Sequence, residues 1–231
     1  MKNLLIIIPT LNESKNVTII FNQIKKFQRK SDIIFIDDNS IDGTKKEILS
    51  LNKKSKKVFN LFRKNKKGIG SAHKTGIKWG YKRNYRYICT MDCDGAHNPK
   101  DLNKMLKKIE NCDLVNTNRF LRKKSLLNWK AHRIFLTKMR YFLVSFILNT
   151  KLDSSGAFRI YDTKKISLKD ILLAKDNHYN FFWESLFYLE KKYKIKEIPV
   201  TIPTRAHGRS KMNFKDIIFG LFYLIKVYSK N

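Results

Sequence analysis

The sequence predicts an α/β fold built on a mostly parallel sheet, and two observations lead to that class. Through residue 118, short apolar runs rich in β-branched residues alternate with longer segments whose apolar residues recur at helical spacing. The first run, 4–9, shows no polar alternation, which suits a strand buried on both faces. The length of 231 residues allows one substantial core. We therefore expect a single domain over 1–231, with halves at 1–120 and 121–231.

The first half contains five expected strands, at 4–9, 32–38, 57–62, 85–92 and 113–118. The segments between them are expected to be helical. "NESKNVTIIFNQIKKF" has apolar residues at 17, 20, 21, 24 and 27. "SIDGTKKEILSL" and "GIGSAHKTGIKWGY" each begin with turn residues, and "PKDLNKMLKKIE" has proline at its first helical position. This order predicts β-α-β units and parallel strands.

The alternation stops after residue 120. A long basic and apolar segment, 122–150, leads to an expected strand at 156–161 and a helix at 179–192. A strand over 193–203 and an amphipathic segment at 213–228 complete the chain. The second half is therefore expected to elaborate the sheet of the first half.

The net charge of +30 indicates a negatively charged partner: nucleic acid, an anionic membrane or a phosphorylated substrate. No acidic residue lies between Asp113 and Asp153. Three cysteines are too few for a disulfide framework, which favours a reducing, cytosolic compartment. The longest apolar runs, 141–150 and 217–225, are about half of the roughly 20 residues needed to span a bilayer, so we expect no membrane-spanning helix.

Polar residues follow four of the expected strands. Because ligands of open α/β sheets bind at the carboxyl ends of the strands, these residues are candidates for one site. They are Pro9 and Thr10 with Glu13, Asp37 and Asp38, Asp92 and Asp94, and Asn118 and Arg119. The glycine-rich "KKGIGSAHKTG" resembles a phosphate-binding loop but lacks the Gly-Lys-Ser/Thr ending of a P-loop.

Asp92 and Asp94 place two carboxylates one residue apart, and these repel unless a cation or hydrogen-bond donors intervene. Oxygen-only ligation favours Mg²⁺ or Mn²⁺, usually with substrate phosphates completing the site. The spacing alone also allows, and by itself favours, an acidic turn that caps the helix beginning at Pro99. Both interpretations remain open on the residues alone.

Several motifs, in order, resemble glycosyltransferase family 2. They are "IIIPTLNES", "IDDNSIDGT", "NKKGIGSAHKTG", "MDCDGAHNPKDL", "DSSGAFRIY", "FFWE" and "EIPVTIPTRAHGRSKM". The pattern is most similar to the dolichol-phosphate or polyprenol-phosphate mannose synthase branch, and it covers residues 4–212. The resemblance implies a GT-A fold, a Rossmann-like sheet that binds a nucleotide-sugar in the first half and the acceptor in the second.

The resemblance also assigns the donor site. The implied nucleotide-sugar contacts are Pro9, Thr10, Glu13, Asp38, Gly70, Asp92, Asp94, Arg205 and Lys211. Asp92 and Asp94 match the D-x-D pair that holds the nucleotide and a divalent metal, Mg²⁺ or Mn²⁺. Ala96 departs from relatives that place an oxygen-bearing side chain there, which puts the metal coordination in question.

The acceptor site and the catalytic residues follow in the same way. The implied acceptor contacts are Arg119, Arg133, Asp153, Ser155 and Glu184, and the implied catalytic residues are Asp94, Arg119, Arg133 and Arg205. "NTNRF" replaces the family's usual G-S-R-Y but keeps Arg119. Guanidinium groups suit this role because they bind phosphate oxygens in a bidentate geometry.

The implied reaction is inverting transfer of a hexose, mannose from GDP-mannose, to a polyprenyl or dolichyl phosphate at the cytoplasmic face of a membrane. An alternative is another family 2 transferase that uses UDP-glucose or a glycan acceptor. A remote alternative is a basic nucleic-acid-binding protein, but no motif for such binding appears, and we expect no nucleic-acid partner.

Segment 129–149 predicts peripheral docking on an anionic membrane surface. At about 100° per residue its four cations, Lys130, Arg133, Lys138 and Arg140, fall within an arc of roughly 160°, leaving a broad apolar face. Segment 214–228 offers a second apolar surface, for the bilayer or for a small membrane subunit. The alternative is that both helices pack on the sheet as core.

Overall fold

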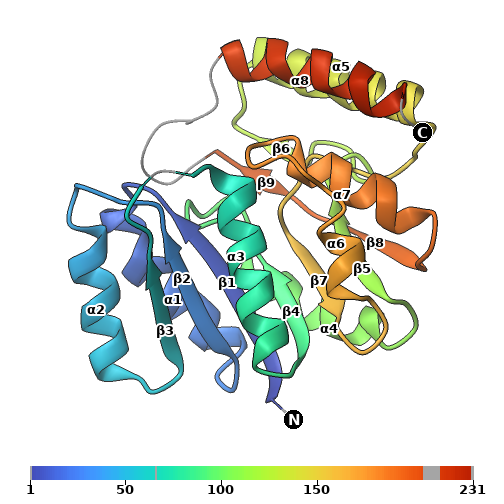
Figure 1. Cartoon of the computed structure of the whole chain (residues 1–231). Helices are drawn as coiled ribbons and strands as arrows, with labels where there is room; N and C mark the ends of the chain where they lie inside the picture. The colour runs from blue at the N-terminus through green and yellow to red at the C-terminus, as the bar shows by residue number, and fades with distance from the viewer. Residues whose placement is uncertain (1, 66, 205–213, 230–231) are drawn as a thin grey trace.

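A seven-stranded sheet forms the centre of the protein in a computed structural model, which describes residues 2–65, 67–204 and 214–229. The strand order is β3-β2-β1-β4-β7-β5-β8 (Figure 1). The strands are β1 (Lys2–Thr10), β2 (Asp32–Asp37), β3 (Val58–Phe62), β4 (Tyr85–Thr90), β5 (Leu114–Asn118), β7 (Arg159–Asp162) and β8 (Ile195–Pro199). All five strands expected in the first half are present, and each lies within two residues of its expected bounds.

The neighbouring strands β3, β2, β1 and β4 are mutually parallel, as are β5 and β8. β7 differs, because it lies between β4 and β5 and runs antiparallel to both. The carboxyl ends of β1, β2, β4 and β5 therefore share one edge, at the top of Figure 1. The fold class is the expected one, with one strand reversed.

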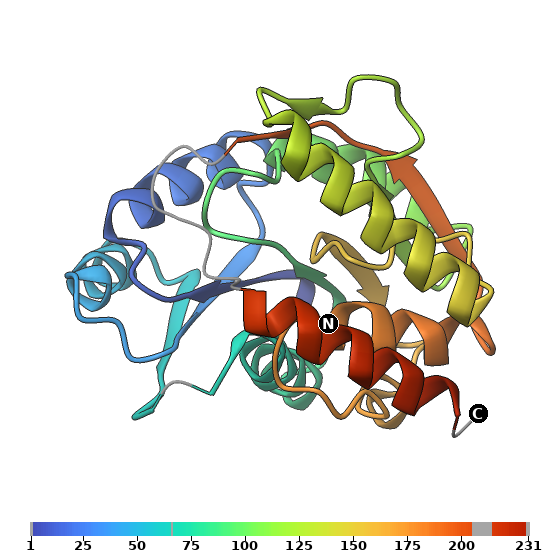
Figure 2. The same ribbon diagram turned by 90° about the horizontal axis from the view of Figure 1, so that it is seen from above.

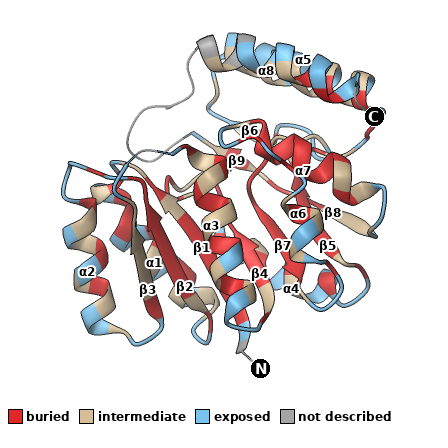
Figure 3. Ribbon diagram, in the orientation of Figure 1, coloured by how far each residue is buried: buried red, intermediate tan, exposed pale blue. Residues whose placement is uncertain are grey.

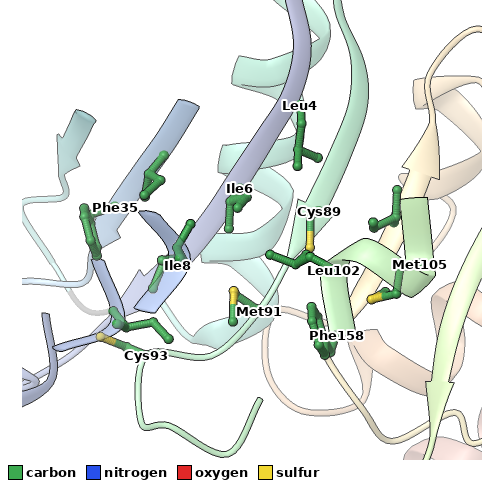
Figure 4. Packing of buried hydrophobic residues seen from close by; sticks show 14 of the residues in the cluster. Leu4, Ile6, Ile8, Phe35, Cys89, Met91, Cys93, Leu102, Met105 and Phe158 are labelled. Carbon is green, nitrogen blue, oxygen red and sulfur yellow. The ribbon is translucent and has the colours of Figure 1, made fainter. Parts of the chain in front are cut away.

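Two hydrophobic layers bury both faces of β1, which explains its unbroken apolar run. Leu4, Ile6 and Ile8 face one core cluster, with Phe35, Cys89, Met91, Leu102 and Met105 (Figure 4). Leu5 and Ile7 face the other cluster. Successive residues of a strand point to opposite faces, so a strand covered on both sides must be apolar at every position.

The helices divide between these two faces. α1 (Ser14–Phe27), α2 (Thr44–Lys54) and α4 (Leu102–Ile109), which follows the short 3₁₀ turn η1 (Pro99–Asp101), pack on the first cluster. α3 (Ile69–Lys82), α6 (Leu168–Ile171) and α7 (Phe181–Glu190) pack on the second. α1, α2 and α4 cover the sheet with an apolar stripe and leave the opposite face exposed, whereas α7 is buried or partly buried along its whole length (Figure 3).

The single strand expected over 193–203 is interrupted. β8 ends at Pro199, and β9 (Ile202–Pro203) leaves the main sheet to pair in parallel with β6 (Leu126–Leu127). This two-stranded sheet links the segment just before the long helix of the second half to the segment that follows β8. The local sequence could not show this, because the pairing joins residues about 76 positions apart.

Two helices, which we call the roof helices, lie above the carboxyl ends of the strands: α5 (Ala131–Leu148) and α8 (Phe214–Tyr228) (Figure 1). They converge toward their C-terminal ends and splay apart toward their N-terminal ends (Figure 2). Val144 and Leu148 of α5 and Leu224 and Val227 of α8 join Trp183 and Phe187 of α7 in a third hydrophobic cluster. Among the described residues, no helix is long and apolar enough to cross a membrane.

Candidate active site

The edge formed by β1 and β2 is closed by hydrogen bonds between its own side chains. Thr10 Oγ1 donates to Asp37 Oδ2 (3.1 Å), and the Ser40 amide donates to Asp37 Oδ1 (3.0 Å). Glu13 is buried and accepts a hydrogen bond from Asn16 Nδ2 (2.6 Å). Pro9 lies within β1, opposite Ile36. These hydrogen bonds therefore hold the residues of the first motif in place at the strand ends.

Asp38 follows β2 and closes the loop that leads into α3. Its buried carboxylate forms an ion pair with Arg63 Nη2 (2.8 Å) and accepts hydrogen bonds from the amides of Lys67 and Gly68. Arg63 in turn donates to Ser71 Oγ (2.9 Å) and to the Gly68 carbonyl (3.1 Å). Asp38 therefore shapes the glycine-rich loop. Arg63 is a residue that the sequence analysis does not name, although a cation directly after β3 and opposite an acidic strand end was a usable signal.

Gly70 lies in the first turn of α3, where the helix approaches the chain before α7 very closely. A Cβ at this position would meet the His178 carbonyl oxygen at 2.6 Å and Phe181 Cβ at 2.7 Å. These contacts explain why a glycine stands there. The observed role of Gly70 is close packing, and its implied contact with a nucleotide-sugar stays a prediction.

Asp92 and Asp94 follow β4 in a turn that projects their side chains differently. Asp94 is only 4% exposed, and its Oδ1 accepts a hydrogen bond from the Ala96 amide (3.0 Å). The Asp92 side chain is 31% exposed, and its own amide donates to His97 Nδ1 (2.9 Å). The next helical turn is capped by Asn98, whose side chain accepts from the Lys100 amide. The alternative that the aspartate pair caps this helix is therefore wrong.

The donor set at Asp92 and Asp94 fits a hard divalent cation shared with a substrate. In the described part of the chain, no cluster of three or more His, Cys, Asp or Glu side chains could hold a metal by itself. One or two carboxylates can hold Mg²⁺ or Mn²⁺ when phosphate oxygens and water supply the remaining ligands. Ala96 cannot add a side-chain oxygen, so a cation at this place would need ligands from a bound nucleotide.

Arg119 and Asp153 meet at the carboxyl end of β5. Arg119 Nε lies 2.7 Å from Asp153 Oδ2, which also accepts a hydrogen bond from the Arg119 amide (3.1 Å). Ser155 Oγ donates to the other oxygen, Asp153 Oδ1 (3.1 Å). Asp153 is 1% exposed. The fold thus brings Arg119 together with two other implied acceptor residues, Asp153 and Ser155, although Asp153 lies 34 positions later in the sequence.

Glu197 of β8 supports this pair and is a second residue to which the sequence analysis gives no role. Its Oε1 accepts hydrogen bonds from Asn116 Nδ2 (2.7 Å) and the Asp153 amide (2.9 Å), and its Oε2 accepts from Asn118 Nδ2 (2.6 Å). Burial raises the pKa of Glu197. A carboxylate inside the expected strand that contains β8 is the signal that could have located it, because β5 carries Asn116 and Asn118 near its end.

The remaining implied residues lie in different surroundings. On α5, the Arg133 guanidinium stacks over Trp129, 3.7 Å from the ring centroid. Glu184 of α7 is buried and accepts hydrogen bonds from the Asp176 amide (3.0 Å) and Tyr223 Oη (3.0 Å), so it links α7 to the roof helix α8. Arg205 and Lys211 lie outside the described residues.

Comparison with solved structures identifies the class to which this architecture belongs. The protein superimposes on glucosyl-3-phosphoglycerate synthase from Mycobacterium tuberculosis, crystallised with Mn²⁺, UDP-glucose and phosphoglyceric acid, with a TM-score of 0.68. The match covers 97% of this chain and 77% of that one, at 14% sequence identity. The mostly parallel sheet with flanking helices is therefore a GT-A-like glycosyltransferase fold, as the sequence led us to expect.

Residues 5–172 match the model of glycosyl transferase family 2, and the chain belongs to that family. A Micrococcus luteus undecaprenyl-phosphate mannosyltransferase is 29% identical over 211 residues, covering 90% of this chain and 87% of its own. A Mycolicibacterium smegmatis polyprenol monophosphomannose synthase is 28% identical over 226 residues, covering 94% and 84%. The expected likeness to the polyprenol-phosphate mannose synthase branch is confirmed, and the protein is a glycosyltransferase.

Proposed function

We propose that the protein transfers mannose from GDP-mannose to the phosphate of a polyprenyl lipid. The observation that carries the proposal is the placement of the Arg119–Asp153 pair at the same strand-end edge as Asp92 and Asp94. Asp92 and Asp94 suit a nucleoside diphosphate with a metal ion, and the guanidinium of Arg119 suits a second phosphate. The names of the two mannosyltransferase relatives support the same assignment.

The proposed chemistry requires little from a general base. A phosphate monoester carries about 1.5 to 2 negative charges near neutral pH, so the acceptor oxygen is already a nucleophile. It attacks the anomeric carbon as the bond to the nucleoside diphosphate breaks, which inverts the configuration. Arg119, held by Asp153, orients the acceptor phosphate.

Asp92 and Asp94 act at the leaving group in this proposal. A Mg²⁺ or Mn²⁺ ion held by their oxygens would supply positive charge next to the departing nucleoside diphosphate. The buried position of Asp94 fixes one carboxylate in place, while Asp92 is more exposed and open to a substrate. Contacts of Thr10, Glu13, Asp38, Gly70, Arg205 and Lys211 with the nucleotide-sugar remain part of the proposal.

The outer face of the roof helices supports docking on an anionic membrane, the proposed location being the cytoplasmic face. Large apolar residues point outward from both helices, among them Phe146 (76% exposed) and Phe222 (70% exposed). The others are Phe135, Leu136, Met139, Phe142, Phe219, Leu221, Ile225 and Tyr228. An exposed apolar surface of this kind, beside the exposed Lys130 and Lys138, suits the interface of a bilayer.

The substrate assignment is tested by turnover. Purified protein is incubated with polyprenyl phosphate, Mg²⁺ or Mn²⁺, and labelled GDP-mannose, UDP-glucose or UDP-N-acetylglucosamine in parallel. The expected product is a mannosyl phospholipid formed only from GDP-mannose and lost with a chelator. Transfer from a uridine nucleotide, or to a dephosphorylated polyprenol equally well, would overturn the proposal.

Docking is tested by flotation with liposomes at low and high salt. The wild type is expected to float with anionic vesicles and to be released by salt, because each basic residue near anionic lipid contributes about 1 kcal/mol. Lys130→Glu/Lys138→Glu should prevent flotation, whereas Lys53→Glu/Lys54→Glu, the same charge change on exposed positions of α2, should leave most of it. Binding that requires a co-purifying membrane subunit would instead assign the apolar face to a protein partner.

A further inference from the structure

Glu197 of β8 accepts three hydrogen bonds that converge on its carboxylate. Its Oε1 accepts from Asn116 Nδ2 (2.7 Å) and from the Asp153 amide (2.9 Å), and its Oε2 accepts from Asn118 Nδ2 (2.6 Å). The donors belong to two segments, β5 and the stretch between α5 and β7. One side chain therefore ties together the end of β5, which leads into Arg119, and the segment that contains Asp153.

Asn116 is oriented from both sides by opposite charges. Its Oδ1 accepts a hydrogen bond from Nε of the fully buried Arg159 (3.2 Å), and its Nδ2 donates to Glu197 and to the Asp153 carbonyl (2.9 Å). If the amide turned over, its NH₂ group would face the guanidinium and its oxygen would face the carboxylate. Both backbone groups of Asp153 are thus held, the amide by Glu197 and the carbonyl by Asn116.

Asn118 holds the other partner of the Arg119–Asp153 pair. It directly precedes Arg119, and its Oδ1 accepts a hydrogen bond from the Phe120 amide (2.6 Å) while its Nδ2 donates to Glu197. This side chain is also fixed in orientation, because turning it over would set its NH₂ group against the Phe120 amide. Arg119 therefore lies between two residues whose hydrogen bonds lead to Glu197.

We propose that Glu197 is a positioning residue that sets how tightly the acceptor phosphate binds. The inference rests on the proposed function, in which Arg119 orients that phosphate. Arg119 Nε is occupied by Asp153 Oδ2 (2.7 Å), so the direction of the remaining guanidinium N–H groups depends on where Asp153 lies. All three groups that meet Glu197 are donors, so the arrangement requires two acceptor oxygens and not merely a side chain of this size.

Glu197→Gln tests this requirement, because it keeps the shape of the side chain and replaces one acceptor oxygen with an NH₂ group. Whichever way the new amide turns, at least one of the three donors meets another donor. We expect the acceptor KM for a short, water-soluble isoprenyl phosphate to rise about 10- to 100-fold, with an unchanged donor KM. Calorimetry with the same isoprenyl phosphate measures binding without turnover.

A second substitution should restore the lost bond with its direction reversed. In Glu197→Gln/Asn118→Asp, the aspartate oxygens can accept from the Phe120 amide and from the glutamine NH₂ group, and the glutamine oxygen keeps the other two bonds. The net charge also returns to that of the wild type. We expect most of the acceptor KM to be recovered, whereas Asn118→Asp alone sets two carboxylates against each other and should raise the acceptor KM.

Asp162→Asn is the control for a purely structural loss. Asp162 is buried at the other end of β7, where it accepts hydrogen bonds from Arg86 Nη2 (2.6 Å) and from the Lys164 amide (3.0 Å). Its replacement should lower the melting temperature and leave both KM values unchanged. A wild-type acceptor KM for Glu197→Gln, or a folded double variant that recovers nothing, would overturn the inference while the proposed function stands.

Asn118→Ser removes the same bond from its other end, and its acceptor KM decides the question should Glu197→Gln not fold. A raised acceptor KM with an unchanged donor KM supports the inference, and wild-type values overturn it. A wild type that binds the isoprenyl phosphate in the calorimeter but transfers no sugar to it would overturn the proposed function itself. The effect of Glu197→Gln on binding then still tests the positioning role.

Discussion

The strand-end edge and the roof helices differ in whether their side chains find hydrogen-bond or packing partners within the chain. At the edge, Asp37, Asp38 and Asp153 each accept several hydrogen bonds from neighbouring loops. On the roof, large apolar side chains such as Phe142 and Phe146 project outward from helices whose inner faces are already packed. Bonds within the chain hold the edge together, whereas the roof presents an apolar surface of the kind that a partner or a membrane covers.

The largest expected effect is a loss of transfer activity at the strand-end edge while its structure is kept. Asp94→Asn keeps the volume of the side chain and removes the buried carboxylate, so transfer should fall about 10²- to 10³-fold, on the order of 3–4 kcal/mol in activation free energy. The measurement is kcat/KM, with Mn²⁺ titrated in the presence of the nucleoside diphosphate.

Asp101→Asn serves as the control for that change, because it removes a carboxylate whose partner, Lys104, is on the surface. It should leave both activity and Mn²⁺ dependence at wild-type levels. Full turnover by Asp94→Asn would remove this residue from the site and leave the edge as a structural feature.

The second prediction concerns the buried pair on the acceptor side. Asp153→Asn leaves the Arg119 charge uncompensated, so the free energy of unfolding should drop by about 3 kcal/mol. A double-mutant cycle with Arg119→Gln, followed by urea unfolding, isolates the coupling between the two side chains. Strict additivity would mean that the pair does not act as a unit and that the edge is less organised than its hydrogen bonds indicate.

The third prediction tests a buried group beneath the edge. His73 of α3 packs against Phe181 and Phe182, neither ring nitrogen has a partner within the described residues, and burial lowers its pKa to about 3. Below about pH 6.5 the His73 ring binds a proton in the unfolded chain but stays neutral in the folded protein. The free energy of unfolding therefore falls as the pH drops from that value toward 3.

For one proton this slope is about 1.4 kcal/mol per pH unit, or about 2 kcal/mol between pH 6.5 and pH 5. His73→Phe should lose that part of the acid sensitivity while keeping the ring packing. Urea unfolding of both proteins at pH 7.5, 6.5 and 5 measures it. Parallel pH profiles for wild type and variant would show that His73 is paired in solution.

The smallest effect on stability is expected at the outer face of the roof. Phe142→Ser/Phe146→Ser should change the free energy of unfolding by only about 0.5 kcal/mol, because both side chains are already exposed. Val144→Ala, on the inner face of the same helix, should cost about 2 kcal/mol. Liposome flotation should reverse the order, with the serine variant defective and the alanine variant normal. A large loss of stability in the serine variant would show that the outer face packs against the protein.

The first half of the fold could be predicted from the sequence because its elements are determined locally. Each strand is a short apolar run, each helix has its own periodic stripe, and each β-α-β unit pairs neighbours in the chain. β7 could be recognised as a strand but not placed, since its insertion between β4 and β5 depends on contacts about 43 to 75 residues away in sequence. The β6–β9 pair has two residues on each side and no periodicity to detect.

The candidate site divides in the same way. That Asp92 and Asp94 follow a strand could be read from the sequence, but their different exposures depend on the fold of the turn, in which the Asp92 amide bonds to His97, whose ring stacks on Phe158. The sequence identified Arg119 and Asp153 separately, and only the fold pairs them. Arg140 and Lys138 have the same charge and lie two residues apart, and the packing of α5 alone directs one inward and the other outward.

The third hydrophobic cluster has a consequence for the order in which the protein opens. Its residues tie the C-terminal ends of both roof helices to α7, separately from the two layers that cover the sheet. A small cluster of this kind forms a cooperative unit whose opening costs less than global unfolding. The amides of α5 and α8 should therefore exchange with solvent together and sooner than those of β1 and β4. The two helices would then open and close over the strand ends as one body, while the sheet stays folded beneath them.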